Sequence, residues 1–242
     1  EPSLENNLLK FENLLINLTA NPECPELHNI LSTVKPIVLP KEVTGEKNSE
    51  QLISNIHLKT PEITKVQCFL DMDIEGFLLG ILWTMLIGSK LDDKFGDYVY
   101  GNRIQRQFKE NSKELLSPYL FEPYFTNYEK WRDNALDIAE RTLDADQKDA
   151  VIVTADLKSF YYSVNLDNSF WNSIDEIIEE IENNTNTPEG INLKPLNNAI
   201  KTIISEYSKY FKGNSSILPI GFEPSMVLAN QYLSDLDKAI IN

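Results

Sequence analysis

Cysteine, histidine and basic residues are all scarce in this chain of 242 residues. The 2 cysteines, Cys24 and Cys68, lie far apart, which excludes a disulfide scaffold and favours a reducing compartment with free thiols. His28 follows Cys24 closely, but no second Cys/His pair with tight spacing occurs. The sequence therefore does not predict a structural zinc site, and two buried thiols are the simpler interpretation.

Long hydrophobic runs and a secretory signal are also missing. The longest apolar run covers residues 77–88, whereas a helix needs about 20 apolar residues to cross a bilayer. The first residues lack a basic region followed by an apolar one. We therefore expect a cytoplasmic protein with no membrane partner, in which residues 73–90 form a buried core helix.

Positive charge is in deficit, because 37 acidic residues face 22 basic ones and the net charge is -15. Proteins that coat nucleic acid are usually basic, since phosphate neutralisation supplies most of their affinity. Net charge is a sum over the whole surface, however, and a local basic groove remains compatible with it. Acidic side chains gather at 175–182, whereas basic ones cluster in two other segments, namely Arg103, Arg106, Lys109 and Lys113, then Lys130 and Arg132.

What the chain does contain is the composition of a globular protein, with 42% hydrophobic and 24% charged residues. Pro36, Pro40 and Gly45 predict a loop or linker over residues 35–50. The β-branched run VIVTA predicts a strand over residues 151–155 that is buried on both faces. Apolar periodicity predicts amphipathic or buried helices over 4–20, 73–90, 121–143, 169–182, 195–212 and from Pro224 onward.

Aromatic residues recur at helical spacing in the segment that begins at Tyr119. Phe121, Tyr124, Tyr128 and Trp131 fit one helical face, with Pro123 in the first turn. An aromatic stripe of this kind usually packs into a core, and we expect that here.

A carboxylate, Asp156, ends the predicted strand. Mg²⁺ prefers oxygen ligands and is commonly held by one or two carboxylates plus substrate phosphates, and the peptide oxygen of Leu157 is a further candidate ligand. A tight turn from Leu157 to Phe160 would aim N–H groups at a triphosphate. Tyr161 would then lie beneath the sugar and leave no room for a 2′-hydroxyl. Taken alone, Asp156 also fits an ordinary turn or helix cap.

Two segments, in the same order along the chain, resemble motifs of the reverse transcriptase family. VIVTADLKSFYYSV (151–164) is similar to its motif A, and LPIGFEPSMVLANQYLSDLD (218–237) is similar to its motif B. Tyr100-Gly101-Asn102-Arg103, with the aromatic segment through Trp131, resembles the fingers of bacterial antiphage-defence reverse transcriptases of the abortive-infection and unknown groups. The resemblance covers residues 75–242.

The resemblance implies an α+β fold, with an N-terminal helical extension (1–60), a fingers-like region (61–150) and a partial palm (151–242) without a thumb. Asp156 and Leu157 would bind Mg²⁺, and Tyr161 would be the sugar gate. The resemblance also implies residues that contact the nucleotide or support the residues that do. These are Leu157, Phe160, Arg103, Gly221, Ser225 and Asn230.

Two departures accompany the resemblance. Ile220 stands where the family often has Gln beside the incoming nucleotide. The Tyr-x-Asp-Asp of motif C does not occur before Asn242, and Asp235 and Asp237 belong to a helical pattern. We therefore expect this sequence to be part of a longer protein and to be inactive alone.

The implied function is RNA-directed DNA polymerisation by two-metal nucleotidyl transfer in bacterial antiviral defence. Template, primer and deoxynucleotides would be its partners, and self-association stays open. Untemplated or protein-primed DNA synthesis is a neighbouring alternative. An inactive palm that serves as a binding or assembly module is another, and an acidic helical domain with accidental matches is the simplest.

Overall fold

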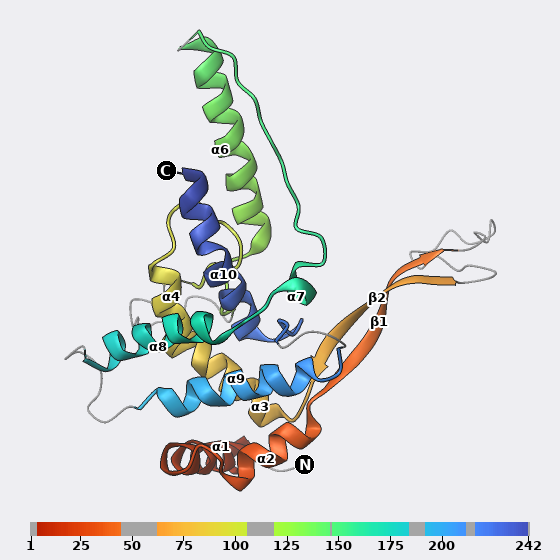
Figure 1. Cartoon of the computed structure of the whole chain (residues 1–242), viewed down its shortest axis with the longest axis vertical. Coiled ribbons are helices and arrows are strands. Elements are labelled where there is room, and N and C mark those ends of the chain that lie inside the picture. Colours follow the sequence, from red (N-terminus) through yellow and green to blue (C-terminus); the bar gives the residue numbers. More distant parts are fainter. Residues whose placement is uncertain are drawn as a thin grey trace.

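The computed structural model is a mixed α+β structure, as predicted, in which helices predominate and one antiparallel pair of strands forms the sheet among the residues it describes (Figure 1). The described residues are 4–44, 62–105, 119–145, 147–183, 192–211 and 216–241.

The sheet lies near the N-terminus of the element order, and helices make up the rest. In chain order the elements are α1 (Leu4–Ala20), α2 (Pro25–Thr33), β1 (Lys35–Thr44), β2 (Glu62–Asp71), α3 (Ile74–Trp83), the π-helical turn η1 (Thr84–Gly88), α4 (Ser89–Asp93), α6 (Tyr124–Asp144), α7 (Phe160–Ser163), α8 (Asn168–Asn183), α9 (Lys194–Ser208) and α10 (Glu223–Ile241).

The core is helical, and α3 lies at its centre against α9 and α10. Trp83 is fully buried there, and its indole N–H donates a 2.9 Å hydrogen bond to Oδ1 of Asn197 on α9. The amide of Asn197 in turn donates to Asp175 on α8. The predicted buried helix is therefore confirmed, and polar side chains fix its packing partners.

The apolar helical run from Ile74 to Asp93 is interrupted by the π-helical turn η1. At Gly80, a Cβ would clash with the Phe222 ring, so the missing side chain makes room for that buried ring just before α10. By length and composition alone this run of 20 residues passes for a membrane span, but 50% of its apolar window is buried inside the protein. Such burial is typical of the core helix of a globular protein.

The predicted loop over 35–50 is wrong for residues 35–44, which form β1. This strand pairs antiparallel with β2, with Lys35 opposite Asp71 and Val38 opposite Cys68. Pro36 and Pro40 are compatible with the pairing because each strand of a two-stranded sheet has an open edge for a residue without N–H. The remainder of the predicted loop lies outside the described residues.

The predicted strand at 151–155 is also wrong, because this segment has no regular structure and is exposed. Val151 is 86% exposed, and the chain runs back along the length of α6 toward α7 (Figure 1). A buried strand needs a neighbouring strand for its backbone N–H and C=O groups. Within the described residues no strand lies beside 151–155.

The aromatic stripe of α6 is not part of the core, contrary to the prediction. The helix projects away from the helical body (Figure 1). A stripe is buried only where another element packs against it, and on α6 Tyr124, Phe125, Tyr128 and Trp131 are all exposed. Only Asn127 of α6 is buried among its described side chains.

The other predicted helices are confirmed with small shifts of their ends. α1 and α8 match the predicted ranges closely, and α9 ends at Ser208. The acidic side chains Glu176, Glu179 and Glu180 of α8 are exposed, as expected of a solvated face. One hydrophobic core contains residues from Leu14 to Ala229. It therefore includes residues of all three predicted regions, namely 1–60, 61–150 and 151–242.

Candidate functional site

The first motif (residues 151–164) ends in a tight turn just after Asp156. Ser159 has left-handed backbone angles, φ 54 and ψ 35, and one turn of helix, α7, follows it. The Ser159 carbonyl accepts hydrogen bonds from the Tyr162 N–H (2.9 Å) and the Ser163 hydroxyl (3.1 Å). The turn expected after Asp156 is therefore present, whereas Asp156 and Leu157 themselves are exposed.

The first motif and the second motif (residues 218–237) lie against each other. The Leu218 N–H donates a 3.0 Å hydrogen bond to the Tyr161 carbonyl. The ring of Phe160 also meets the ring of Tyr232 on α10, with 6.1 Å between centroids. Two segments that are far apart in the sequence thus form one surface.

Tyr162 fastens the first motif to β2. Its hydroxyl accepts a 2.9 Å hydrogen bond from the Cys68 N–H, and the hydroxyl of Tyr207 on α9 donates to the Cys68 carbonyl at 3.0 Å. The Tyr162 hydroxyl also donates to the Cys68 carbonyl at 3.4 Å, and burial raises the pKa of both phenols. The sequence offered no signal for this pairing, because only the fold brings these segments together.

Tyr161 connects the first motif to the Tyr100–Arg103 segment. Its half-buried side chain lies close enough to Asn102 for that side chain to influence the hydroxyl. Burial raises the pKa of the Tyr161 hydroxyl, and the neighbouring Asn102 offsets part of that rise. Asn102 itself has a positive φ of 51, a conformation that asparagine tolerates better than most residues. The ring of the predicted sugar gate also packs edge to face against Phe160, with 6.0 Å between centroids.

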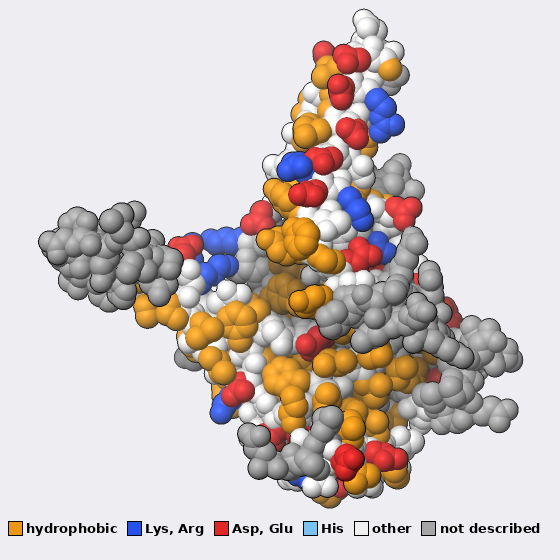
Figure 2. Space-filling view, turned by 180° about the vertical axis from the view of Figure 1, so that it is seen from behind, with side chains coloured by type: hydrophobic (Ala, Val, Ile, Leu, Met, Phe, Trp, Pro, Cys, Tyr) orange, Lys and Arg blue, Asp and Glu red, His pale blue; other side chains and the backbone are white. Residues whose placement is uncertain are grey.

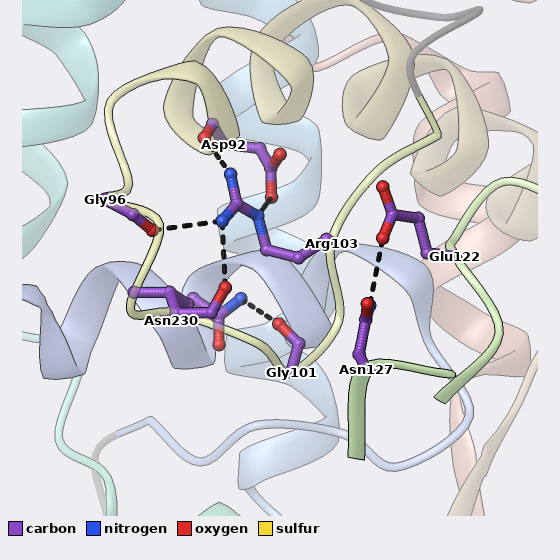
Figure 3. A network of polar contacts seen from close by, with 8 residues as sticks. Asp92, Gly96, Gly101, Arg103, Glu122, Asn127 and Asn230 are labelled. Atoms are coloured by element: carbon purple, nitrogen blue, oxygen red, sulfur yellow. Dashed lines mark hydrogen bonds and ion pairs between the residues drawn. The ribbon is translucent and has the colours of Figure 1, made fainter. Parts of the chain in front are cut away.

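Arg103 lies inside the protein and is held by Asp92 (Figure 3). Nε donates to Asp92 Oδ1 at 3.1 Å, and the Arg103 side chain is 17% exposed while that of Asp92 is 0% exposed. The terminal nitrogens donate to the carbonyls of Asp92, Gly96 and Val99. This geometry favours a structural role, because the guanidinium is directed at the loop rather than at a ligand.

The same loop is joined to the second motif through Asn230. Its Nδ2 donates a 2.8 Å hydrogen bond to the Gly101 carbonyl (Figure 3). Three motif segments therefore converge, since Tyr161 meets Asn102 and Asn230 meets Gly101. Of the predicted basic cluster, Arg106, Lys109 and Lys113 lie outside the described residues.

Gly221 turns the second motif onto the edge of β2. The preceding Ile220 accepts a 2.9 Å hydrogen bond from the Leu70 N–H and forms a short parallel bridge with Phe69. Gly221 has φ 83, and a side chain there would lie 3.4 Å from the Phe69 ring. The glycine that the resemblance placed beside a nascent base pair is thus required by the backbone.

We expect Gly221→Ala to lower the free energy of unfolding by about 1–2 kcal/mol, because an L side chain is strained at positive φ. Chemical denaturation measures this. Gly101→Ala is the matched control, since a side chain there meets nothing within 4 Å. Equal stability of the two variants would contradict the strain at Gly221.

Ser225 and Glu223 open α10 with buried oxygens that have no hydrogen-bond partner among the described residues. Ser225 is 1% exposed, and its Oγ is unpaired, as is Oε2 of Glu223. Unpaired buried polar atoms are rare and costly, so each calls for an explanation. The resemblance pointed to Ser225, whereas sequence reasoning missed Glu223.

The oxygens expected to bind Mg²⁺ match that ion in kind but not in number. The Asp156 carboxylate and the Leu157 peptide oxygen are hard oxygen donors. In the part of the chain that the structure describes, no group of three His, Cys, Asp or Glu side chains comes together for a metal ion. Further carboxylates are therefore needed for a two-metal centre.

No protein-family model, no curated protein and no solved structure matches this chain. The resemblance to reverse transcriptases thus depends on the sequence motifs alone.

Proposed function

We propose that this chain provides the fingers and part of the palm of a reverse transcriptase, an RNA-directed DNA polymerase of bacterial antiviral defence. The supporting observation is the convergence of three motif segments, in which the Leu218 N–H donates to the Tyr161 carbonyl and Asn230 donates to the Gly101 carbonyl. Motif segments of one active site have to be neighbours in space, and these three are. The assignment to defence comes from the similarity of the Tyr100–Arg103 region to antiphage enzymes.

In this proposal the residues act by binding and positioning. Asp156 and the Leu157 peptide oxygen would hold Mg²⁺, which would neutralise charge on the triphosphate. The ring of Tyr161 lies under the sugar and excludes a 2′-hydroxyl. The turn at Gly221 lets the backbone approach the new base pair. The primer 3′-oxygen then attacks the α-phosphate, and pyrophosphate leaves.

Primer extension by the full-length gene product tests the role of Asp156. We expect Asp156→Asn to lower the rate of deoxynucleotide incorporation roughly a hundredfold, because the carboxylate supplies charge for metal binding. Asp149→Asn is the control, since Asp149 is exposed and belongs to the same extended segment. Equal rates for both variants would remove Asp156 from the mechanism. Sequencing the product then distinguishes templated from untemplated synthesis.

An inactive palm that binds or assembles is the second candidate. It is favoured by the exposure of Asp156 and by the absence of a three-residue metal group among the described residues. This candidate predicts no incorporation by the full-length gene product and no Mg²⁺-dependent binding of deoxynucleotides. Titration of a fluorescent deoxynucleotide with and without Mg²⁺ therefore decides between the two.

Tyr161 allows a separate test of sugar selection. We expect Tyr161→Ala to relax discrimination against ribonucleotides by about tenfold or more, because the ring no longer fills the space of the 2′-hydroxyl. Tyr161→Phe keeps the ring and removes only the hydroxyl that meets Asn102, so its discrimination stays near the unmodified level. The ratio of kcat/KM for deoxynucleotides and ribonucleotides is the measurement. An unchanged ratio in Tyr161→Ala contradicts the gate.

A further inference from the structure

A second candidate site lies at the base of α6, where α6 meets the start of α10. Hydrophobic side chains gather in this region on the face that Figure 2 shows. The residues there line an open pocket of about 860 Å³, a volume within the range of small-molecule sites. Its described lining residues are Ile81, Met85, Tyr119, Leu120, Phe121, Glu122, Pro123, Tyr124, Phe125, Glu223 and Met226.

Aromatic rings dominate the wall contributed by residues 119–125. Tyr124 and Phe125 pack edge to face, with ring centroids 6.1 Å apart, and both are exposed to solvent. Hydrogen bonds hold this wall in place, because the Gln105 N–H donates to the Leu120 carbonyl and the Glu122 N–H donates to the Arg103 carbonyl. The opposite wall consists of side chains from α3, η1 and α10.

The charge in the pocket has one sign. Among the described lining residues there are two carboxylates, Glu122 and Glu223, and no lysine, arginine or histidine. Oε2 of Glu122 accepts a hydrogen bond from Nδ2 of Asn127 (Figure 3). Oε2 of Glu223 is buried with no partner in the described part of the chain. Burial raises the pKa of Glu223, the expected effect of removing a carboxylate from water without an opposite charge.

We propose that this pocket binds a small organic cation with an apolar body, whose ammonium or guanidinium group pairs with Glu223. Aromatic faces attract cations, and an unpaired carboxylate supplies the opposite charge. The apolar body would pack on Ile81, Met85 and Met226. Phosphate-bearing ligands are disfavoured, because they would bring negative charge to two carboxylates. The pocket is therefore separate in ligand chemistry from the proposed nucleotide site.

Three probes that share the same apolar group but differ in charge test this proposal. They are 4-phenylbutylamine, which is a cation at neutral pH, 4-phenylbutanol, which is neutral, and 4-phenylbutyrate, which is an anion. Binding is followed by nuclear magnetic resonance of the protein, with methionine methyl groups as reporters for Met85 and Met226. We expect the cation to bind most tightly, the alcohol about tenfold more weakly, and the anion not at all.

Two variants connect the result to the pocket. Glu223→Gln keeps the shape of the side chain and is expected to lower the affinity for the cation to that of the alcohol. Phe125→Leu keeps an apolar surface but loses the ring. It should therefore lower the affinity for the cation several-fold more than the affinity for the alcohol. Glu176→Gln on the exposed face of α8 is the control and should bind the cation unchanged. Circular dichroism confirms that each variant is folded.

The proposal is overturned if the anion binds as well as the cation, or if Glu223→Gln leaves the preference for the cation intact. It is also overturned if no probe shifts the reporters, in which case a segment of this chain or another protein fills the pocket.

Discussion

Replacing Asp92 with alanine is expected to lower the free energy of unfolding by about 3–5 kcal/mol, the cost of leaving one partner of a buried ion pair alone. Asp92 is fully buried, and its carboxylate accepts a hydrogen bond from Nε of Arg103. Without the carboxylate, the guanidinium keeps its positive charge in a site that water hardly reaches. Urea denaturation of the purified chain, followed by circular dichroism, measures the loss.

Asp93 supplies the matched control for Asp92. It is the next residue along α4, but its ion pair with Lys90 is exposed and 3.8 Å long. Exposed pairs contribute about 0–1 kcal/mol, so Asp93→Ala should have a small effect. A double variant, Asp92→Ala with Arg103→Ala, should lose less than the sum of the single losses. Equal effects at positions 92 and 93 would contradict the buried pair.

Trp83→Ala is the second large prediction, with an expected loss of about 3–5 kcal/mol. Trp83 is fully buried at the centre of the helical core. Its removal leaves a cavity and also takes the indole N–H from Asn197 Oδ1. Thermal unfolding followed by calorimetry gives the comparison.

Trp131→Ala tests the same substitution at an exposed site. Trp131 packs only against Tyr128 among its ring contacts, with 5.5 Å between centroids, and is 43% exposed. We expect a loss below about 1 kcal/mol. A large loss at Trp131 would mean that the aromatic stripe of α6 is buried after all, whereas a small loss at Trp83 would contradict its central place in the core.

The buried helix could be predicted from sequence because its signal is local. Residues 77–88 are apolar on every face, and a helix of that kind has to be surrounded by protein. The strand β1 could not be predicted, because its prolines indicate a loop unless the partner strand is known. The pairing with β2 is set by residues distant in sequence, such as Cys68 opposite Val38.

The segment at 151–155 shows the converse error. Its composition favours a buried strand, yet burial depends on neighbours that the segment does not specify. The same reason explains α6, where helical spacing was predicted correctly and the burial of its aromatic face was not. Local patterns set the conformation that a segment prefers, while tertiary contacts decide whether that preference is realised and which face is covered.

The candidate site was predicted in part. Sequence reasoning chose Tyr161, Gly221 and Asn230; the structure gives Tyr161 and Asn230 hydrogen bonds and gives Gly221 a positive φ. Arg103 was predicted to contact a ligand, because a basic residue in a motif favours phosphate. The sequence does not show that the guanidinium instead pairs with Asp92. Glu223 was missed because an acidic residue in the first turn of a helix is ordinary, and only the surrounding pocket makes it unusual.

The hydrogen bonds at Cys68 anchor the two-stranded sheet to α7 and α9. β1 and β2 pair mainly with each other, and the phenol groups of Tyr162 and Tyr207 both form hydrogen bonds with the backbone of Cys68 in β2. A displacement of β2 at Cys68 would therefore move Tyr162, the neighbour of Tyr161 in the first motif.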